Sequence, residues 1–493
     1  MNIFKKKSLC AALAGIGALG AAGAAQAVNL NPDGLGQVLI YPYYTTRTDA
    51  HGNAFNSLLS VVNSTASVKA VKVRFLEGKN SREVLDFNLF LSPKDVWTAG
   101  VVPMGDGAGI VTNDVSCTIP AIPAGGKAFV NFAYTADGAD STLDRTREGY
   151  VEIIEMASFA DDSDTAANVT HVSGVPPGCA KQTDALAASE ALPPGLPDTD
   201  NRQGLFGGMT LINVDAGSDY TADAVALDNF SDVALYTNAG SIQPDLTRAS
   251  PATSVVFANG FVYTSFWDPA TADPVSAVLM HDHVMNEFVL DSLTNSGTDW
   301  VVTMPTKRFY VSNGTGAPPR LFQRNFNKTA GACDDVDLAI YDREENTTST
   351  PLDFSPPPPT LSNAICWEAN VITFNNSNVL GSTNSANVPT TFENGWLDVG
   401  FFPASVSGGV HTLPNNDTIV TDIFAFFNEG PATYVGLPVI GFAVQSFANG
   451  AINVGGVDTL SNYGGNFVQK STRRIDAVVP SETAGVKSLR KQQ

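Results

Sequence analysis

Charge, histidine and long apolar runs are all scarce in this chain of 493 residues. Charged residues make up 16% of it, and 49 acidic residues against 28 basic ones give a net charge of −21. A chain this acidic repels nucleic acid and anionic lipid, so we expect no nucleic-acid partner. The apolar stretch at residues 9–20 is too short to span a bilayer, so we expect no transmembrane segment.

Recognisable catalytic motifs are missing too. The sequence contains no nucleophile elbow, no HExxH zinc motif, no Walker loop and no dinucleotide-binding fingerprint. Glycosidases need two carboxylates that face each other, but Glu152 and Glu155 lie three residues apart in a predicted strand and point to opposite faces. We therefore expect a protein without enzymatic activity. A secreted hydrolase with a site built from distant carboxylates is the least favoured alternative.

The first 27 residues have the pattern of a secretory signal peptide. Residues 5–7 are lysines, residues 9–20 form a short apolar core, and residues 25–27 (AQA) form a small-x-small cleavage site. We predict that residues 1–27 are removed on export and that the mature chain starts at Val28. Because the sequence shows no lipobox, no second apolar span and no sorting motif, we expect non-covalent contacts to hold the protein at a surface.

The composition favours strands and turns over helices. The chain has 43 Gly and 29 Pro and is rich in β-branched and small polar residues. Residues 70–76 (AVKVRFL) alternate, with Lys72 and Arg74 on one face, which predicts a half-buried strand. Residues 36–44 predict another strand, which Pro42 would place at a sheet edge. Similar short strands recur along the chain, so we predict an all-β fold of β-sandwich-type domains with long loops.

A polar, proline-containing stretch at residues 184–204 divides the chain, although its first seven residues hint at a short helix. Taken as a boundary, it gives an N-terminal β-sandwich-like domain over residues 28–200 and a C-terminal β-rich domain over residues 201–475. A disordered tail is predicted over residues 476–493. The alternative is that the stretch is a long loop within one larger sandwich.

Four cysteines follow the signal peptide: Cys117, Cys179, Cys333 and Cys366. An even number in an exported chain predicts two structural disulfides, for which the sequence alone allows three pairings. Pairing Cys117 with Cys179 and Cys333 with Cys366 puts one bridge in each half and closes the shorter loops. No CxxC pair occurs, so the spacing does not resemble that of a zinc site.

Two groups of residues are candidate metal ligands. His281 and His283 lie two residues apart, so on a strand both imidazoles would face the same way and could bind one metal ion. Asp334, Asp335 and Asp337 form an acidic cluster of the kind found in calcium-binding loops, although it matches no EF-hand. A polar strand edge and solvated turn residues are the alternatives. Calcium is the one cofactor that the sequence suggests, and no motif requires it.

Three blocks of sequence resemble cell-surface proteins of Gram-negative bacteria. They are residues 36–44 (GQVLIYPYY), 71–97 (VKVRFLEGKNSREVLDFNLFLSPKDVW) and 298–310 (TDWVVTMPTKRFY). Such proteins are described as surface-layer-like and have no established enzymatic activity. The resemblance therefore implies an exported, β-rich structural protein, and it carries over no catalytic residue.

These observations predict a secreted structural protein of the cell surface or extracellular matrix of a Gram-negative bacterium. We expect it to self-associate through exposed strand edges and loops, with calcium as a bridge between acidic surfaces. The second hypothesis is a glycan-binding adhesin that uses exposed Trp and Tyr side chains. Its partner would be a cell-surface glycan or lipopolysaccharide.

Overall fold

The computed structural model describes residues 26–49, 51–194, 204–268, 271–311, 320–347, 363–406, 409–422 and 426–479. It is 51% strand and 9% helix, so the predicted all-β fold is confirmed. The predicted signal peptide up to residue 25, and residues 480–493 of the predicted tail, lie outside the described residues.

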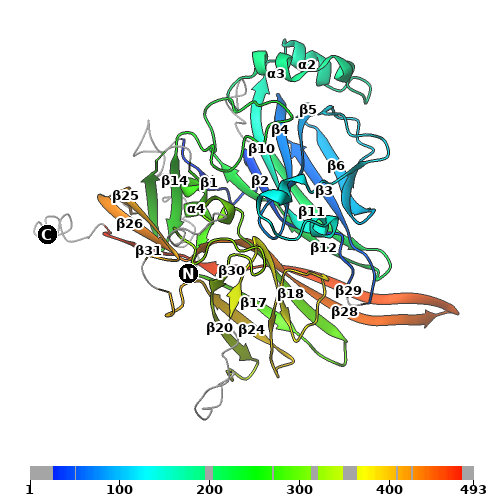
Figure 1. Cartoon of the computed structure of the whole chain (residues 1–493), viewed down its shortest axis with the longest axis vertical. Coiled ribbons are helices and arrows are strands. Elements are labelled where there is room, and N and C mark those ends of the chain that lie inside the picture. Colours follow the sequence, from blue (N-terminus) through cyan, green and yellow to red (C-terminus); the bar gives the residue numbers. More distant parts are fainter. Residues whose placement is uncertain are drawn as a thin grey trace, which may run out of the picture.

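Two antiparallel sheets pack face to face as a β-sandwich in the N-terminal part of the molecule (Figure 1). The first sheet contains, in spatial order, β1 (Asn29–Leu30), β13 (Val225–Asp228), β2 (Val38–Thr45), β10 (Glu148–Phe159), β4 (Val68–Glu77), β5 (Glu83–Leu91) and β8 (Thr118–Ile119). The second contains β12 (Ser218–Asp223), β11 (Leu205–Asn213), β3 (Asn56–Asn63), β6 (Val96–Met104), β7 (Gly107–Val111) and β9 (Lys127–Ala128). Leu39 and Val73 from the first sheet share one buried core with Val61 and Trp97 from the second.

Three larger sheets and two strand pairs make up the C-terminal part. The first sheet contains β14 (Thr253–Ala258), β15 (Phe261–Phe266), β25 (Thr412–Thr421), β26 (Phe427–Val435) and β31 (Arg474–Ala477). The second contains β20 (Asp337–Asp342), β24 (Asn394–Gly400), β17 (His283–Val289) and β30 (Lys470–Thr472). The third contains β23 (Ser385–Val388), β22 (Ala369–Phe374), β18 (Ser296–Thr303), β28 (Ile440–Val454) and β29 (Val457–Val468). The pairs are β16 (Met280–His281) with β27 (Leu437–Pro438) and β19 (Asp334–Asp335) with β21 (Ala364–Ile365).

Helices are short, and the longest in the described residues have seven residues. The α-helices are α2 (Asp164–Val169), α3 (Asp184–Glu190) and α4 (Asp273–Leu279). The 3-10 helices are η1 (Phe132–Ala136), η2 (Leu143–Arg147), η3 (Cys179–Lys181) and η4 (Lys307–Phe309). The hydroxyls of Ser163 and Thr183 accept backbone N–H bonds at the first turns of α2 and α3, as expected of N-cap residues. The weak helical pattern at the start of residues 184–204 is therefore a helix.

The sheets do not divide at residue 200. Strand β11 pairs with β3, β13 pairs with β1 and β2, and β12 pairs with β11, so the first two sheets extend to Asp228. A second core also joins the parts of the chain, because Ile40 and Tyr150 belong to the same buried cluster as Trp300. At the other end, β31 pairs with β26 and continues to Ala477, two residues beyond the predicted end of the C-terminal domain.

Strand β2 is interior to its sheet, so the predicted edge position of this strand is wrong, although β13 pairs only with Val38–Ile40 and Pro42 itself lies beyond that pairing. Strand β2 sits between β13 and β10. Tyr44 pairs with Gly149 but Tyr41 pairs with Val151, which leaves one extra residue in β2 at this point, a β-bulge. A bulge lets an interior strand hold proline, whose nitrogen cannot donate to the ladder.

Strand β4 is buried on both faces, so the predicted half-buried strand is also wrong. The connection between β13 and β14, residues 229–252, covers its polar face, and we call this segment the covering loop. Lys72 Nζ donates to the backbone carbonyls of Asn238 and Ala239 at 3.3 and 3.4 Å. Leu246 of the same loop is fully buried in the core. The basic residues of β4 therefore point into a closed layer of protein.

Candidate functional site

The predicted histidine pair is split between two sheets. His281 pairs in β16 with β27, and His283 pairs in β17 with β24. His283 Nδ1 lies 2.8 Å from Asp398 Oδ1 at a partly exposed site. His281 lines a cavity of about 140 Å³, and burial beside Arg473 lowers its pKa to about 3. The two rings therefore have different surroundings.

Two of the three predicted acidic ligands have separate partners, and the third, Asp337, is an exposed residue at the start of β20. Asp334 is fully buried and bonds Lys307 Nζ at 2.8 Å and His411 Nε2 at 3.1 Å. Lys307 holds the pKa of Asp334 below its usual value although burial opposes this. Asp335 accepts a bond from Gln323 Nε2 at 3.1 Å. Across the described residues, no group of three or more His, Cys, Asp or Glu side chains is placed to hold a metal ion.

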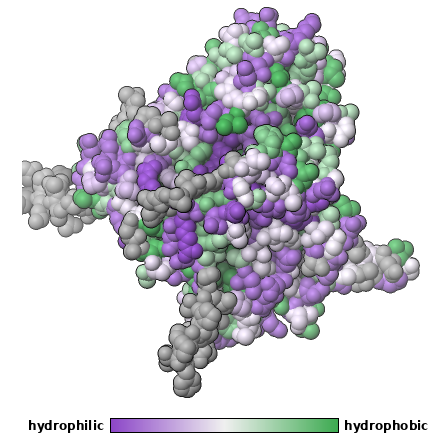
Figure 2. Space-filling view, in the orientation of Figure 1, coloured by the Kyte–Doolittle hydropathy of each residue, from purple (hydrophilic) through white to green (hydrophobic). Residues whose placement is uncertain are grey.

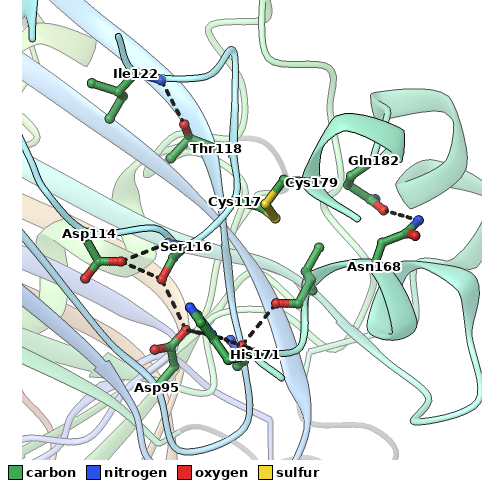
Figure 3. The surroundings of a disulfide bond; sticks show 12 residues. Asp95, Asp114, Ser116, Cys117, Thr118, Ile122, Asn168, His171, Cys179 and Gln182 are labelled. Atoms are coloured by element: carbon green, nitrogen blue, oxygen red, sulfur yellow. Dashed lines mark hydrogen bonds and ion pairs between the residues drawn. A yellow bond between two sulfur atoms is a disulfide. The ribbon is translucent and has the colours of Figure 1, made fainter. Parts of the chain in front are cut away.

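Both predicted disulfides form, and each joins two cysteines that follow one another in the order of cysteines along the chain. Cys117 bonds Cys179, and Cys333 bonds Cys366. Figure 3 shows the first bridge, which ties the segment before β8 to η3. It thereby fastens the helical end of the molecule, where α2 and α3 lie in Figure 1, to the sandwich.

His171 and Asp95 lie beside the first disulfide (Figure 3), and Ser92 contacts the same histidine. Ser92 Oγ lies 2.6 Å from His171 Nδ1, and Asp95 Oδ2 lies 3.6 Å from the same nitrogen. In a catalytic triad the nucleophile and the carboxylate bind opposite ring nitrogens. Ser92 Oγ also donates to the backbone carbonyl of Val169 at 3.1 Å. This cluster therefore has the geometry of a structural contact that fastens the residues after α2.

A cavity of about 350 Å³ opens between the β4–β5 turn, the covering loop and the segment that follows β18. Its lining residues are Arg74, Asn80, Ser81, Arg82, Ile242, Asp245, Arg308, Phe309 and Val311. We call it the arginine pocket. It brings together three guanidinium groups, one carboxylate and an apolar side in a chain with few basic residues, and it is the most distinctive binding feature of the fold.

The β4–β5 turn is held rigidly at the rim of this pocket. The carboxylate of Glu77 accepts backbone N–H bonds of 2.7–2.9 Å from Lys79, Asn80 and Arg82. Arg145 of η2 then donates two bonds of 2.7 Å to the same carboxylate. These bonds satisfy the turn's backbone donors and fix the positions of Asn80 and Arg82.

Arg74 at the floor of the pocket is fully occupied. Its Nη1 donates to Glu152 Oε2 at 2.6 Å, and its Nε donates to Glu83 Oε2 at 2.8 Å. Burial raises the pKa of Glu152, while the guanidinium of Arg74 opposes this. Arg74 therefore serves to join β4, β5 and β10.

Arg308 and Arg82 have donors to spare. Arg308 reaches only the carbonyl of Ser81 at 3.4 Å and Asp245 Oδ2 at 3.6 Å, both long contacts. Its Nε is buried with no hydrogen-bond partner among the described residues. Arg82, whose side chain is 27% exposed, contacts Asp137 through Nε at 3.2 Å. These two side chains could therefore bind an added acceptor.

Glu368 lies directly behind the pocket. Its Oε2 accepts bonds from Ser81 Oγ at 2.8 Å and from the backbone N–H of Arg308 at 3.2 Å. Burial raises the pKa of Glu368 to about 8. The side chain is therefore mostly protonated and uncharged near neutral pH.

The hairpin β28–β29 projects from the body of the molecule (Figures 1 and 2). Figure 2 shows hydrophobic residues at its end. Val454, Val457, Tyr463 and Val468 are all between 59% and 72% exposed. β29 is the last strand of its sheet within the described residues, and β12 lies against its middle. There Asn462 Nδ2 donates to the backbone carbonyl of Ala216, just before β12. The rest of the outer edge of β29 is a possible pairing surface.

Sequence reasoning missed the arginine pocket. Arg74 and Arg82 lie within residues 71–97 and Arg308 within residues 298–310, but nothing in their spacing indicated that they meet. Basic residues inside apolar strands were the available signal.

Among the described residues, no helix combines the length and apolar character needed to cross a membrane. Comparisons of the chain with protein-family models, with curated proteins and with solved structures find no match in any of the three.

Proposed function

We propose that this chain is a secreted, non-enzymatic structural protein of a bacterial cell surface or extracellular matrix, and that it binds copies of itself through the β28–β29 hairpin. The observation that carries the proposal is the exposed, apolar and nearly uncharged hairpin. Soluble proteins normally protect long edge strands with charged residues or by covering them. A projecting edge that carries almost no charge and is covered by β12 only at its middle is suited to pairing with another chain.

Charge explains why a second copy would bind at this place. The whole chain carries −21, so two copies repel each other over most of their surfaces. Residues 449–468 contain a single charged side chain, Asp458, and no basic residue. The hairpin is therefore a surface where two copies can approach with little electrostatic cost. Antiparallel pairing of two β29 edges would then join backbone donors to acceptors and bury the exposed valines.

Sedimentation of the mature protein over a range of concentrations tests this. We expect oligomers to grow with concentration and with added salt, because salt screens the repulsion between acidic surfaces. The double variant Val457→Lys with Val468→Lys should remain monomeric. Val172→Lys is the matched control, since Val172 is 59% exposed but lies near α2. Equal association of the wild-type protein and the double variant would refute the role of the hairpin.

A glycan-binding adhesin is the second candidate, supported by one aromatic pair. Tyr341 and Trp396 stack on neighbouring strands with ring centroids 4.5 Å apart, and Trp396 is 39% exposed. Such a platform can stack on a sugar ring. By contrast, Trp97 and Trp300 are fully buried. A protein that stays monomeric at high concentration and whose fluorescence changes on adding sugars would favour this candidate over self-association.

A further inference from the structure

We propose that the arginine pocket binds a small hydroxylated carboxylate of the size of a single sugar acid, with its carboxylate on Arg308 and Arg82 and its hydroxyl groups on Asp245. This site is separate from the β28–β29 hairpin. Its occupation does not depend on self-association.

The charge of the ligand follows from the unfilled donors. Buried polar groups in folded proteins nearly always have hydrogen-bond partners, so the unpartnered Nε of Arg308 marks an incomplete site. The contacts of Arg308 to Ser81 and Asp245 are long, and Arg82 has one contact of 3.2 Å. A guanidinium offers a planar fork of donors that matches a carboxylate, which can accept two parallel bonds.

The rest of the ligand follows from the other walls. Asp245 is 7% exposed, and its carboxylate is held in place by Thr247, which donates to Oδ1, and by Gln243 Nε2, which donates to Oδ2 at 2.9 Å. Oδ2 can accept one further bond. An anion alone would be repelled by Asp245, whereas a ligand with hydroxyl groups can donate to it. Ile242, Phe309 and Val311 supply an apolar wall for a carbon skeleton.

Size selects a small ligand. The volume of about 350 Å³ is at the lower end of the range, roughly 300–1,000 Å³, of small-molecule pockets. Arg308 is also steadied for binding, because its guanidinium carbon lies 4.4 Å from the centre of the Phe309 ring. A preorganised side chain loses less entropy when a ligand binds.

Isothermal titration calorimetry of the mature protein with glucuronate tests the proposal. We expect binding of glucuronate, at least about tenfold weaker binding of glucose, which lacks the carboxylate, and similarly weak binding of inorganic phosphate, which lacks the carbon skeleton. Equal affinity for phosphate and glucuronate would overturn the sugar-acid assignment. No heat from glucuronate at about 10 mM, a concentration far above ordinary ligand affinities, would overturn the site itself.

Variants locate the binding in the pocket. Arg308→Gln should weaken glucuronate binding by about tenfold or more, since it removes the charged fork. Arg474→Gln is the matched control, because Arg474 is an exposed arginine paired with Asp476 at a distant strand. Ile242→Trp fills the mouth of the pocket from a side chain that is 65% exposed, so it tests the site even if Arg308→Gln folds poorly. Unchanged binding in the Ile242→Trp protein would refute the assignment.

Discussion

Replacing Glu368 with glutamine is expected to flatten the dependence of folding stability on pH between about pH 7 and pH 8. The buried carboxyl has its pKa raised to about 8, whereas in the unfolded chain it returns to its ordinary value of 4.5. Between these values the folded protein holds a proton that the unfolded chain has released. The stabilising contribution of Glu368 is therefore fully present below its unfolded pKa of 4.5. It is lost as pH rises through its folded pKa of about 8, and the loss is roughly 1.4 kcal/mol per pH unit.

The interval near pH 8 separates Glu368 from other buried groups. Burial raises the pKa of Asp299 to about 6 and that of Asp228 to about 7, so their contributions to the slope end at lower pH. His281, with its pKa lowered to about 3, contributes only below its ordinary value of 6.5. Burial also raises the pKa of Glu152 and of Glu83, so the part of the slope above pH 7 that belongs to Glu368 is the difference between the wild-type and Glu368→Gln slopes.

Urea unfolding followed by tryptophan fluorescence, with the disulfides intact, measures this slope. Trp97 and Trp300 are fully buried and will report the transition. Glutamine keeps an oxygen that can accept the bonds from Ser81 and Arg308, so stability below the unfolded pKa of 4.5 should change by less than about 1 kcal/mol. The control Asp299→Asn should leave the slope above pH 7 intact. Parallel stability curves for the wild-type and Glu368→Gln proteins from pH 7 to pH 8 would refute the reasoning.

Two further predictions concern the groups that hold the sandwich together. Arg145→Ala should lower the free energy of unfolding by roughly 3–5 kcal/mol, because it leaves the buried carboxylate of Glu77 without its cation and leaves Asp137 with Arg82 alone. Denaturant titration measures this, and a loss below 1 kcal/mol would contradict it. Replacing Cys117 and Cys179 together with serine should lower the free energy of unfolding by about 4 kcal/mol, because this disulfide closes a loop of 62 residues. Replacing Cys333 and Cys366 in the same way should cost about 0.5 kcal/mol less, because that loop spans 33 residues. The reverse order of stabilities would contradict the loop-entropy account.

The fold class and the disulfide framework could be predicted because both depend on local information. Short alternating strands between turns indicated an all-β fold, and the even number of cysteines predicted two bridges, while three pairings stayed open. The burial of β4 on both of its faces could not be predicted in this way. Its alternation of Val71, Lys72, Val73 and Arg74 is the same whether water or protein covers the polar face. The distant covering loop, residues 229–252, determines that protein and not water covers the polar face of β4.

The candidate sites failed to emerge from the sequence for a related reason. Local spacing suggested that His281 and His283 share a metal, but the chain changes sheets between them, so a two-residue spacing no longer means a shared face. Asp334 likewise pairs with Lys307 and His411, which are distant in sequence. The arginine pocket draws on segments more than 200 residues apart, from Arg74 to Arg308.

The buried charges of the first sheet have a physical role that hydrophobic residues could not fill. With protein on both faces, apolar alternation alone would tolerate a strand shifted by one residue, because either set of side chains would then be buried. Arg74 pairs in register with Glu152 on β10 and with Asp86 on β5. A shift of one residue would set Arg74 against Val151 or Ile153 and leave a buried charge without its partner, which costs several kcal/mol. We infer that these ion pairs fix the register of β4. Arg308 stands outside this ladder, so it keeps the unfilled donors that make the pocket a binding site.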